Sequence, residues 1–494
     1  MNIRRLPFFA LSVVGLLLHN NNAFATNPLI MDQFTADPTA RVFEGKIYVY
    51  PSHDIAASRH IGRGGWFNME DYHVFSSENL TDWTDHGIIV DQTNVSWVNT
   101  SSYAMWAPDC IFKNGKYYFV FPAPAKGGRG GGGARRGAAD TNAATLTPAG
   151  VGTNANTNAV ARGGGFGRGG GGGGGGNRIG VAIADKPYGP FTPEPEPMAG
   201  VGGIDPGLLM DDDGSVYMFV ASPGISEVKL KDNMLEIDGP VQRVANLPTQ
   251  GLIEGPFPFK RNGIYYLTYP HAANVTERLE YAMSTNAMGP YHVAGVMMDE
   301  SPDGCWTDHQ SVVEYKGQWY LFYHERDLSP DFDKNRSIRA EYMEFNDDGT
   351  IKKIVPTYRG VGNVDAKSKI QIDRYSAISD TNNVKVSYLN TNNTFEGWKI
   401  SLNGKGSWVK FDRVDFGKGG LKSVNARSVS STGGSVQVHL DKANGPLLGT
   451  IQVGKASDWK VVTAKASNIP TGLHDLVFTH DEDNQVDIDW VSFE

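Results

Sequence analysis

The stretch "WAPDCIFKNGKYYFVF", residues 106–121, decides the fold because its pattern recurs along the chain. An acidic residue stands beside a proline, and a short apolar run, a polar turn with glycine and an aromatic-rich run follow. Two β-rich runs around a glycine-bearing turn indicate a β-hairpin. Related stretches occur at four other places. The residues that lead the five copies are Asp37, Asp109, Asp205, Glu254 and His309, the last preceded by Asp308.

The spacing of these copies predicts an all-β fold, a five-bladed β-propeller over residues 26–358. The leaders at positions 205, 254 and 309 are 49 and 55 residues apart, close to the roughly 40–50 residues of a four-stranded blade. Equivalent positions of all blades face one central channel, so the leaders are expected to meet at one end of the axis. Clustered carboxylates shift each other's pKa values and mark a functional site.

The first 25 residues are typical of a signal peptide. "MNIRR" is basic, "LPFFALSVVGLLL" is apolar but too short to span a membrane, and Ala23-Phe24-Ala25 is a cleavage signal. We therefore expect a secreted or periplasmic protein, and no lipid anchor because no cysteine lies near the cleavage point. The net charge of −9 argues against a nucleic-acid partner.

Three further features concern the organisation of the chain. Residues 126–177 form a glycine- and arginine-rich insertion that is predicted to be disordered, either as an expanded surface loop or as a segment that contacts acidic polymers. Cys110 and Cys305 are either a disulfide, which export permits, or two buried thiols. After a linker over 359–369, short alternating strands over 370–494 predict a β-sandwich of the jelly-roll type.

The motifs resemble a known family. "ADP" at 36–38, "WAPD" at 106–109, "IDP" at 204–206, "EGPF" at 254–257 and "HQSVVEYKGQWYLFYH" at 309–324 resemble glycoside hydrolase family 43, over about residues 27–355. The segment 370–494, from "IQIDRYS" through "GSWVKF", "GGSVQVHLD" and "DWKVV" to "DIDWVSF", resembles a family 6 carbohydrate-binding module. The arrangement is similar to that of arabinoxylan arabinofuranohydrolases and related xylosidases.

This resemblance implies an inverting mechanism with three carboxyl groups. By family position Asp37 is the general base, Glu254 is the general acid, and Asp205 orients Glu254 and raises its pKa. An inverting glycosidase activates water on one face of the sugar and protonates the leaving oxygen on the other, with the two carboxyls roughly 6.5–9.5 Å apart. Residues from different blades of a propeller suit that separation.

Four other residues are expected at the sugar site. Trp106 either stacks on an apolar sugar face or belongs to the core. Asp109 either lines the site or holds its neighbours by hydrogen bonds. Arg336 matches a family arginine that reaches the sugar, or it is a solvated strand residue. His309 lies on the axis in the family and in some members contacts a central calcium ion or ordered water.

The C-terminal module has its own expected site. Trp398 and Trp459 match the aromatic pair that sandwiches a sugar in the family. Asp487 stands where the family has an asparagine. It accepts hydrogen bonds but lacks the amide donor, so sugar binding is expected to be altered or lost. Asp373 and Asp489 match positions near a structural calcium ion, and no organic cofactor is expected.

The function predicted from the sequence is that of an exported α-L-arabinofuranosidase or β-xylosidase. Its substrate would be arabinoxylan or its oligosaccharides, polymers of the plant cell wall, and the protein is expected to be a monomer. Two alternatives stay open. An arabinanase uses the same three carboxylates, and a sugar-binding propeller would have lost catalysis although the carboxylates are retained.

Overall fold

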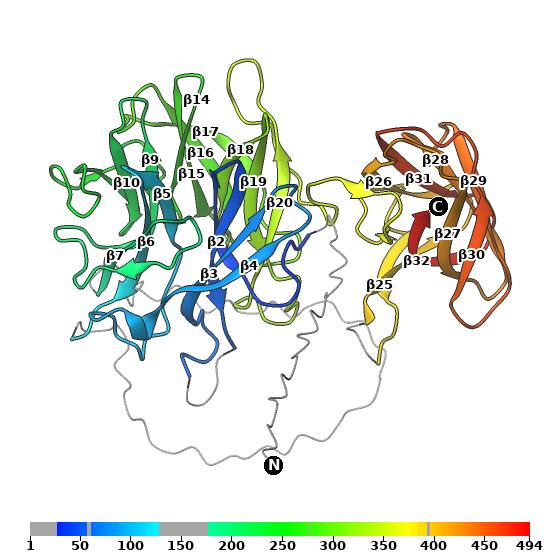
Figure 1. Cartoon of the computed structure of the whole chain (residues 1–494), viewed down its shortest axis with the longest axis horizontal. Helices are drawn as coiled ribbons and strands as arrows, with labels where there is room; N and C mark the ends of the chain where they lie inside the picture. Colours follow the sequence, from blue (N-terminus) through cyan, green and yellow to red (C-terminus); the bar gives the residue numbers. More distant parts are fainter. Residues whose placement is uncertain (1–26, 57–60, 128–175, 275, 393–395) are drawn as a thin grey trace, which may run out of the picture.

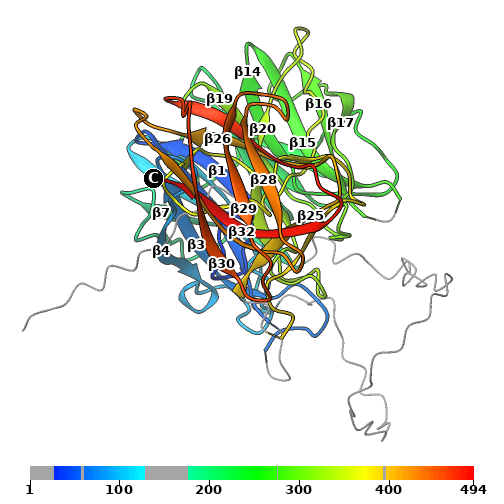
Figure 2. The ribbon, with the colours of Figure 1, turned by 90° about the vertical axis from the view of Figure 1, so that its right-hand side faces the viewer.

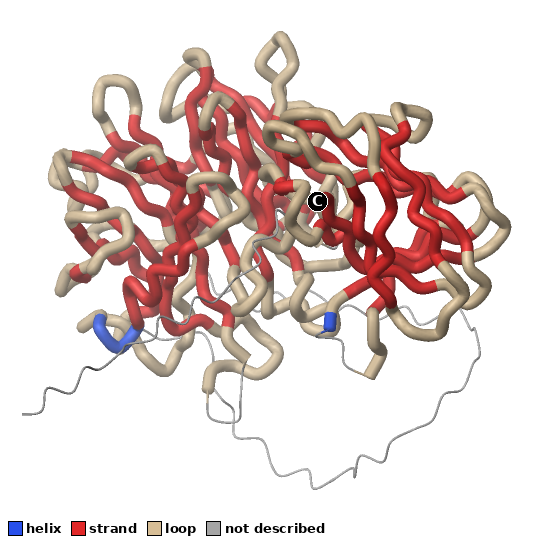
Figure 3. The backbone as a smooth tube through the Cα atoms, turned by 45° about the vertical axis from the view of Figure 1, so that its right-hand side comes forward, coloured by secondary structure: helices blue, strands red, loops and turns tan. Residues whose placement is uncertain are grey.

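The computed structural model describes residues 27–56, 61–127, 176–274, 276–392 and 396–494. Strands and loops make up almost all of the described chain (Figure 3). The predicted signal peptide and most of the predicted insertion lie outside the described residues. Within the described ranges, no helix is long and apolar enough to cross a membrane.

Five antiparallel sheets follow one another along the first two thirds of the chain (Figure 1). The first sheet contains β1 (Ala36–Phe43), β2 (Lys46–Asp54), β3 (Met69–Ser77) and β4 (Thr84–Asp91). The second contains β5 (Asp109–Lys113), β6 (Lys116–Pro124), β7 (Asn177–Ala184) and β8 (Thr192–Pro193). The third contains β9 (Ile204–Met210), β10 (Val216–Ala221), β11 (Ile225–Leu230) and β12 (Gln242–Arg243).

The fourth sheet contains β13 (Leu252–Ile253), β14 (Phe257–Arg261), β15 (Ile264–Ala272), β16 (Arg278–Ser284) and β17 (His292–Met298). The fifth contains β18 (Ser311–Tyr315), β19 (Gln318–Glu325) and β20 (Ser337–Met343). The innermost strands contact one another in a closed cycle: β1 with β5, β5 with β9, β9 with β14, β14 with β18, and β18 with β1. This cycle is the five-bladed propeller predicted from the repeated hairpins.

The N-terminal segment completes the fifth blade, which has three strands of its own. The amide of Leu29 donates to the carbonyl of Ile338 at 2.9 Å, and the amide of Thr35 donates to the carbonyl of Arg336 at 2.9 Å. The hydroxyl of Thr35 accepts from the amide of Ile338 at 3.1 Å. Residues from the two ends of the propeller therefore close the ring side by side.

Adjacent blades are held together by interlocked aromatic and aliphatic side chains. Tyr72 of the first blade packs against Phe119 and Phe121 of the second, with ring centroids 5.0 and 5.9 Å apart. All three side chains are almost fully buried. Burying one such side chain stabilises a fold by about 1.5–3 kcal/mol, so each interface between blades holds the inner strands in place around the axis.

The inner strands break their regular pairing at the same level in three blades. Pairing shifts register at Asp37 in β1 and at Asp205 in β9, and it is interrupted at Glu254 between β13 and β14. A proline, which has no N–H for the ladder, follows at each break. Asp37 and Asp205 have φ values of 46° and 54°, and Gly255 has 51°. Such bulges re-aim side chains, in this case at one end of the channel.

Two six-stranded sheets form the C-terminal sandwich around one hydrophobic core (Figures 1 and 2). One contains β21 (Val364–Asp365), β23 (Ala377–Ile378), β26 (Ser407–Asp415), β28 (Gly434–Leu440), β29 (Leu447–Val453) and β31 (Leu473–His480). The other contains β22 (Ile370–Gln371), β24 (Val384–Tyr388), β25 (Trp398–Asn403), β27 (Ser423–Val429), β30 (Lys460–Lys465) and β32 (Gln485–Phe493).

The boundary between the two domains differs from the predicted one. Residues 359–369 were expected to be a linker, but β21 lies within this range and pairs in parallel with β26 of the sandwich. Arg359 is only 1% exposed and donates to the carbonyls of Gly362 and Asp412. The sandwich therefore begins before residue 370, because a strand too short to recognise by alternation joins its sheet.

The two cysteines are both buried free thiols. Cys110 lies in β5, and Cys305 lies in the loop that precedes β18. This agrees with the second of the two alternatives that the sequence left open.

Candidate active site

Three carboxyl groups from three blades meet where the inner strands break. The Asp205 carboxylate accepts a hydrogen bond from the amide of Gly255 at 3.1 Å, so it lies against the residue that follows Glu254. A Cβ on Gly255 would stand 3.0 Å from Nδ1 of His309. His309 Nδ1 in turn lies 4.0 Å from an oxygen of Asp37. Because glycine has no Cβ, residue 255 of the fourth blade can lie against His309 of the fifth blade while its amide bonds Asp205 of the third. His309 in turn lies near Asp37 of the first blade.

Asp37 is held by a buried arginine. Arg336 Nη1 donates to one oxygen of Asp37 at 2.6 Å, and Nη2 donates to the other at 3.3 Å. The same guanidinium bonds Asp54 through Nε at 2.9 Å and through Nη2 at 3.0 Å, and its face lies 4.6 Å from the ring of Phe67. Arg336 is thus neither a solvated strand residue nor, in this structure, an open sugar ligand, because its donors are used on two carboxylates.

A histidine that the sequence analysis did not single out fixes the backbone of Asp37. Nδ1 of His324 accepts from the amide of Asp37 at 3.1 Å, and Nε2 faces the carbonyl of Thr307 at 3.1 Å. These partners require a neutral ring with its proton on Nε2. Burial, followed by repulsion from Arg336, lowers the pKa of His324 well below its ordinary value. A neutral His324 supports the left-handed backbone of Asp37 without neutralising its carboxylate.

The electrostatics keep Asp37 ionised. Burial alone would raise the pKa of this carboxyl, but the attraction of Arg336, with smaller contributions from His309 and His324, outweighs it and lowers the pKa to about 2. An anionic carboxylate at neutral pH has the protonation state that a general base needs.

The opposite holds for the other two carboxyls. Burial, followed by repulsion from Asp37, raises the pKa of Glu254 to about 7. Burial, followed by repulsion from Glu254 and Asp37, raises the pKa of Asp205 well above its ordinary value. The coupled pair therefore keeps a proton near neutral pH, which is the state that a general acid needs.

Another carboxyl at this end was missed by the sequence analysis. Glu277 in the fourth blade is 1% exposed, and one of its oxygens accepts from the amide of Asp308 at 2.8 Å. Its Oε1 is buried without a partner of good hydrogen-bond geometry among the described residues. Burial and repulsion from Glu254 raise the pKa of Glu277 well above its ordinary value. A carboxyl that follows a loop outside the repeated hairpin motif gives no signal in the sequence.

Asp109 occupies a different level of the channel from the other leaders. It is fully buried and forms the first pair of the regular β5–β6 ladder, opposite Val120, whereas Asp37 and Asp205 lie at the breaks. Arg41 donates to its two oxygens at 2.9 and 2.5 Å, and the amide of Leu208 donates at 2.7 Å. Asp109 therefore holds its neighbours, and it offers no surface to a sugar.

Trp106 is half-buried. It packs against the core between the first two blades, as Trp66 and Trp306 also do. Its indole nitrogen is buried without a hydrogen-bond partner in the part of the chain that the structure describes. Trp106 thus contributes to the core, and its stacking on a sugar stays a prediction.

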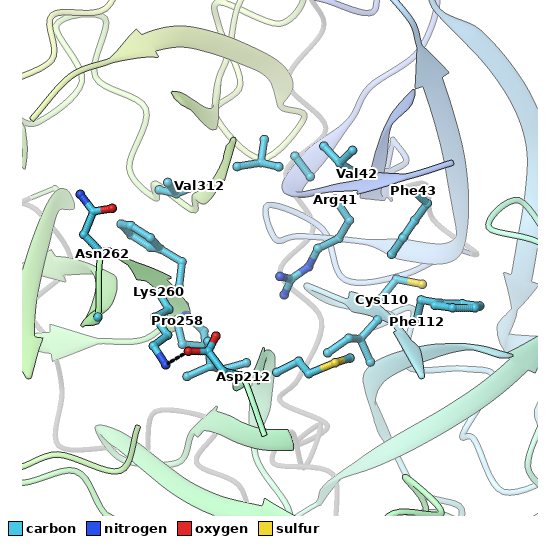
Figure 4. Close-up of a pocket in the computed structure, with 17 residues that line it drawn as sticks. Arg41, Val42, Phe43, Cys110, Phe112, Asp212, Pro258, Lys260, Asn262 and Val312 are labelled. Atoms are coloured by element: carbon cyan, nitrogen blue, oxygen red, sulfur yellow. Dashed lines mark hydrogen bonds and ion pairs between the residues drawn. The ribbon is translucent and has the colours of Figure 1, made fainter. Parts of the chain in front are cut away.

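The opposite end of the channel holds a cavity of about 690 Å³ (Figure 4). It is lined by the far ends of the inner strands, among them Arg41, Phe43, Phe112, Lys260 and Val312. Asp37, Asp205 and Glu254 are absent from this lining. The cavity is therefore separate from the carboxyl cluster.

In the sandwich, the predicted sugar-binding residues are surrounded by cations. The guanidinium of Arg427 lies 5.3 Å from the ring of Trp459, and that of Arg374 lies 4.5 Å from the ring of Trp398. Asp487 forms an ion pair with Lys399. Trp398 and Asp487 lie in strands of one sheet, and Trp459 lies in the loop before another strand of the same sheet. The carboxylate of Asp487 is already engaged in the ion pair with Lys399.

Buried carboxylate oxygens occur at the two places where the resemblance implies calcium. In the sandwich, Oδ1 of Asp373 is buried without a hydrogen-bond partner among described residues. Burial, opposed by Arg374, raises the pKa of Asp373 to about 6, and Asp489 adds to the rise. In the propeller, Oε1 of Glu277 is a second buried carboxylate oxygen without a hydrogen-bond partner among described residues. The other oxygen of Glu277 accepts from the amide of Asp308, the residue before His309. Each place therefore offers one buried carboxylate oxygen, which is the type of ligand that calcium prefers.

With this geometry in hand, comparison with known proteins identifies the family. The model of the glycosyl hydrolases family 43 matches residues 25–351. The chain belongs to this family. The model of the carbohydrate binding module family 6 matches residues 375–494. The chain is therefore a glycoside hydrolase, a propeller followed by a carbohydrate-binding module.

Three proteins illustrate the similarity. A xylosidase/arabinosidase of Humicola insolens is 32% identical, over 66% of this chain and 98% of its own length. An arabinoxylan arabinofuranohydrolase of Bacillus subtilis is 26% identical, over 92% of this chain and 88% of its own. A solved β-xylosidase/α-arabinofuranosidase from a compost metagenome, in complex with xylotriose and in a calcium-free form, has a TM-score of 0.52 and 30% identity, over 68% of this chain and 98% of its own.

Proposed function

We propose that the protein is an exported, inverting family 43 enzyme that releases arabinofuranosyl or xylosyl units from arabinoxylan or its oligosaccharides. The observation that carries the proposal is the opposite protonation of two carboxyls from different blades: Asp37 with a pKa of about 2 and Glu254 with a pKa of about 7. The names of the relatives, xylosidase/arabinosidase and arabinoxylan arabinofuranohydrolase, support the choice of sugars.

The reaction assigns one proton transfer to each carboxyl. The Asp37 carboxylate takes a proton from a water molecule as the oxygen of that water attacks the anomeric carbon. Glu254 gives its proton to the glycosidic oxygen as the bond to the leaving group breaks. After the products leave, Asp37 returns its proton to solvent and Glu254 regains one. Attack from the face opposite the leaving group inverts the anomeric configuration.

The neighbours act by positioning. Arg336 fixes both oxygens of Asp37 and keeps the carboxylate anionic while burial would protonate it. Asp205 accepts a hydrogen bond from the amide next to Glu254, and the two carboxyls repel each other when both are ionised, so the pair retains a proton. Trp106 offers its accessible part to an apolar sugar face.

Calcium is the one cofactor that we propose. Asp373 and Asp489 would hold an ion that stabilises the sandwich. Glu277, with His309 as a neighbour, would hold an ion on the axis. Export rests on the leader-like first 25 residues, and we propose a monomer that acts on plant cell-wall polysaccharide.

The product anomer tests the mechanism. The purified enzyme is incubated with p-nitrophenyl α-L-arabinofuranoside, p-nitrophenyl β-D-xyloside and arabinoxylan, and ¹H NMR follows the first anomer released. We expect release of arabinose or xylose with inverted configuration. A retained anomer would refute the assignment of Asp37 as base. Cleavage of arabinan oligosaccharides with neither glycoside turned over would establish an arabinanase instead.

A further inference from the structure

A cluster of two histidines and an aspartate lies on the first blade, apart from the catalytic carboxyls. His53 is in β2, and Asp71 and His73 are in the neighbouring β3 (Figure 1). One nitrogen of each histidine and one carboxylate oxygen lie within 4.8 Å of one another. Nδ1 of His53 is 2.7 Å from Oδ1 of Asp71, and Nε2 of His73 is 3.9 Å from the same oxygen.

The local structure explains why the three side chains converge. Asp71 and His73 are two residues apart in a strand, so they project from the same face. The β2–β3 ladder is irregular between Ser52 and Asp54, and His53 lies at this irregularity. The bulge turns the imidazole of His53 toward its neighbours, with the two histidine rings 4.9 Å apart.

The carboxylate of Asp85 fixes the orientation of the His73 ring on the side away from Asp71. Its Nδ1 lies 3.1 and 3.2 Å from the two oxygens of Asp85. Asp85 also accepts from Nε2 of Gln33 at 3.0 Å and from the amide of Gly87 at 2.7 Å. With Nδ1 donating to Asp85, Nε2 of His73 presents its lone pair toward Asp71. A carboxylate behind a histidine in this manner is the usual support for a metal-ligating imidazole.

We propose that His53, Asp71 and His73 bind a divalent transition-metal ion of the Zn²⁺ type, with water at the fourth position. Zinc lies about 2.0–2.2 Å from nitrogen and oxygen ligands, which places tetrahedral ligand atoms about 3.4 Å apart. The separations of 2.7 and 3.9 Å bracket that value, so small side-chain rotations suffice. Two imidazoles and one carboxylate favour Zn²⁺ over Ca²⁺, which prefers oxygen ligands.

Access and function agree with a peripheral binding site. Asp71 is 4% exposed, while His53 and His73 are half-buried, so an ion can reach the cluster from solvent. An ion there would join β2 to β3. The ion would also fix His73 and its partner Asp85. Because Gln33 donates to Asp85, the N-terminal segment that closes the ring would be held more firmly. The proposal stands independently of the sugar specificity.

Titration of the full chain tests the site. After treatment with a chelator and its removal, Zn²⁺ is added in a calorimeter, and Co²⁺ is added while visible absorption is followed. The wild type should bind one equivalent of Zn²⁺ and give the absorption of tetrahedral Co²⁺. His53→Gln and His73→Gln should each weaken Zn²⁺ binding by at least about 100-fold, and Asp85→Asn by about 10–100-fold.

The matched control is His292→Gln, since His292 is an exposed strand histidine outside the cluster. This variant should bind Zn²⁺ like the wild type. Circular dichroism and the melting temperature report whether each variant folds, and Asp85→Asn keeps all three ligands if a histidine variant does not. Absence of binding by the wild type, or full affinity in a folded His73→Gln or Asp85→Asn variant, would overturn the proposal.

Discussion

The end of the propeller where Asp37, Asp205 and Glu254 meet and the part of the sandwich around Trp398 and Trp459 both contain several carboxyl groups, but the two regions differ in how these carboxyl groups are paired with cations. In the sandwich each carboxylate has its own cation: Asp373 with Arg374, Asp487 with Lys399, and Asp489 with Arg427. At the catalytic end Arg336 is bonded to Asp37 and Asp54, while Asp205 and Glu254 have no ion pair with any described residue.

This difference teaches what separates a catalytic carboxyl from a structural one. A buried acid beside a cation stays ionised and contributes to packing or binding. A buried acid without a cation keeps its proton near neutral pH, because desolvation and neighbouring charges penalise its ionised form. The propeller places one acid of each kind on the same axis, and acid–base catalysis needs that pair.

The largest effect is expected from Glu254→Gln, which removes the transferable proton and keeps the shape. Turnover of an arabinofuranoside or xyloside with a poor leaving group should fall by about 100- to 10,000-fold, the usual contribution of a general acid. Initial-rate kinetics and the melting temperature are measured together, and the melting temperature should not fall.

The control for this variant is Glu227→Gln in β11. Burial raises the pKa of Glu227 to about 7 as well, but this residue lies on the third strand of its blade, away from the axis. Unchanged turnover in Glu227→Gln would show that position, and not a raised pKa alone, makes an acid catalytic. Wild-type turnover in Glu254→Gln would remove Glu254 from the mechanism.

The second prediction concerns the charge balance around Arg336. Asp54→Ala leaves this buried guanidinium with Asp37 as its remaining carboxylate, so the propeller should lose about 3 kcal/mol of unfolding free energy, at the low end for a broken buried pair. Denaturant unfolding followed by tryptophan fluorescence measures the loss. Glu78→Ala, which removes the partner of Lys46 in an exposed pair, should change the unfolding free energy little. An equally small change in Asp54→Ala would contradict the view that the buried ion pair between Asp54 and Arg336 stabilises the propeller.

The third prediction is the pH dependence of kcat/KM. Activity requires an ionised Asp37 and a protonated Glu254, so it should be maintained from well above pH 2 up to about 7 and fall as pH rises further. Asp205→Asn removes the carboxyl that is coupled to Glu254 and shares a proton with it. The pKa of Glu254 should then fall, which moves the alkaline limb down by about one pH unit. The exposed Asp238→Asn serves as control. An alkaline limb that stays in place in Asp205→Asn would exclude the proposed influence of Asp205 on Glu254.

The smallest effect is expected in the sandwich. Asp487→Asn restores an amide that both donates and accepts, where the carboxylate now pairs with Lys399. One additional hydrogen bond is worth about 0.5–1.5 kcal/mol, so affinity for arabinoxylan in gel electrophoresis should rise several-fold. The turnover of a p-nitrophenyl glycoside should stay constant. Affinity that falls would mean that the ion pair itself belongs to the binding face.

The repeated hairpin motif allowed the propeller and its leading carboxyl groups to be predicted from the sequence. Residues that lie outside the motif were missed. Asp37, Asp205 and Glu254 lead the first, third and fourth of the repeated hairpins, so their meeting follows from the fold. Asp54 and His324 support them from the ends of second strands, where no repeated pattern marks a polar residue as special. Their role depends on distances across the axis that spacing along the chain does not contain.

Asp109 shows the limit of aligning hairpins by their motifs. Its "WAPD" aligns with "ADP" by eye, yet the register places Asp109 opposite Val120 in the first pair of the ladder. Because register decides the level and the direction of every side chain in a strand, the same residue type became a structural partner of Arg41. The start of the sandwich was misplaced for a related reason, since β21 has two residues and no readable alternation.

The closure of the ring has a consequence for shortened forms of the enzyme. Asp37 and the guanidinium that keeps it anionic are 299 positions apart in the chain, and the segment before Asp37 pairs with the strand that begins beside Arg336. The carboxylate of Asp37 therefore gains its buried cation only when the fifth blade is present. A chain shortened before Arg336 lacks both the closing strand and this cation.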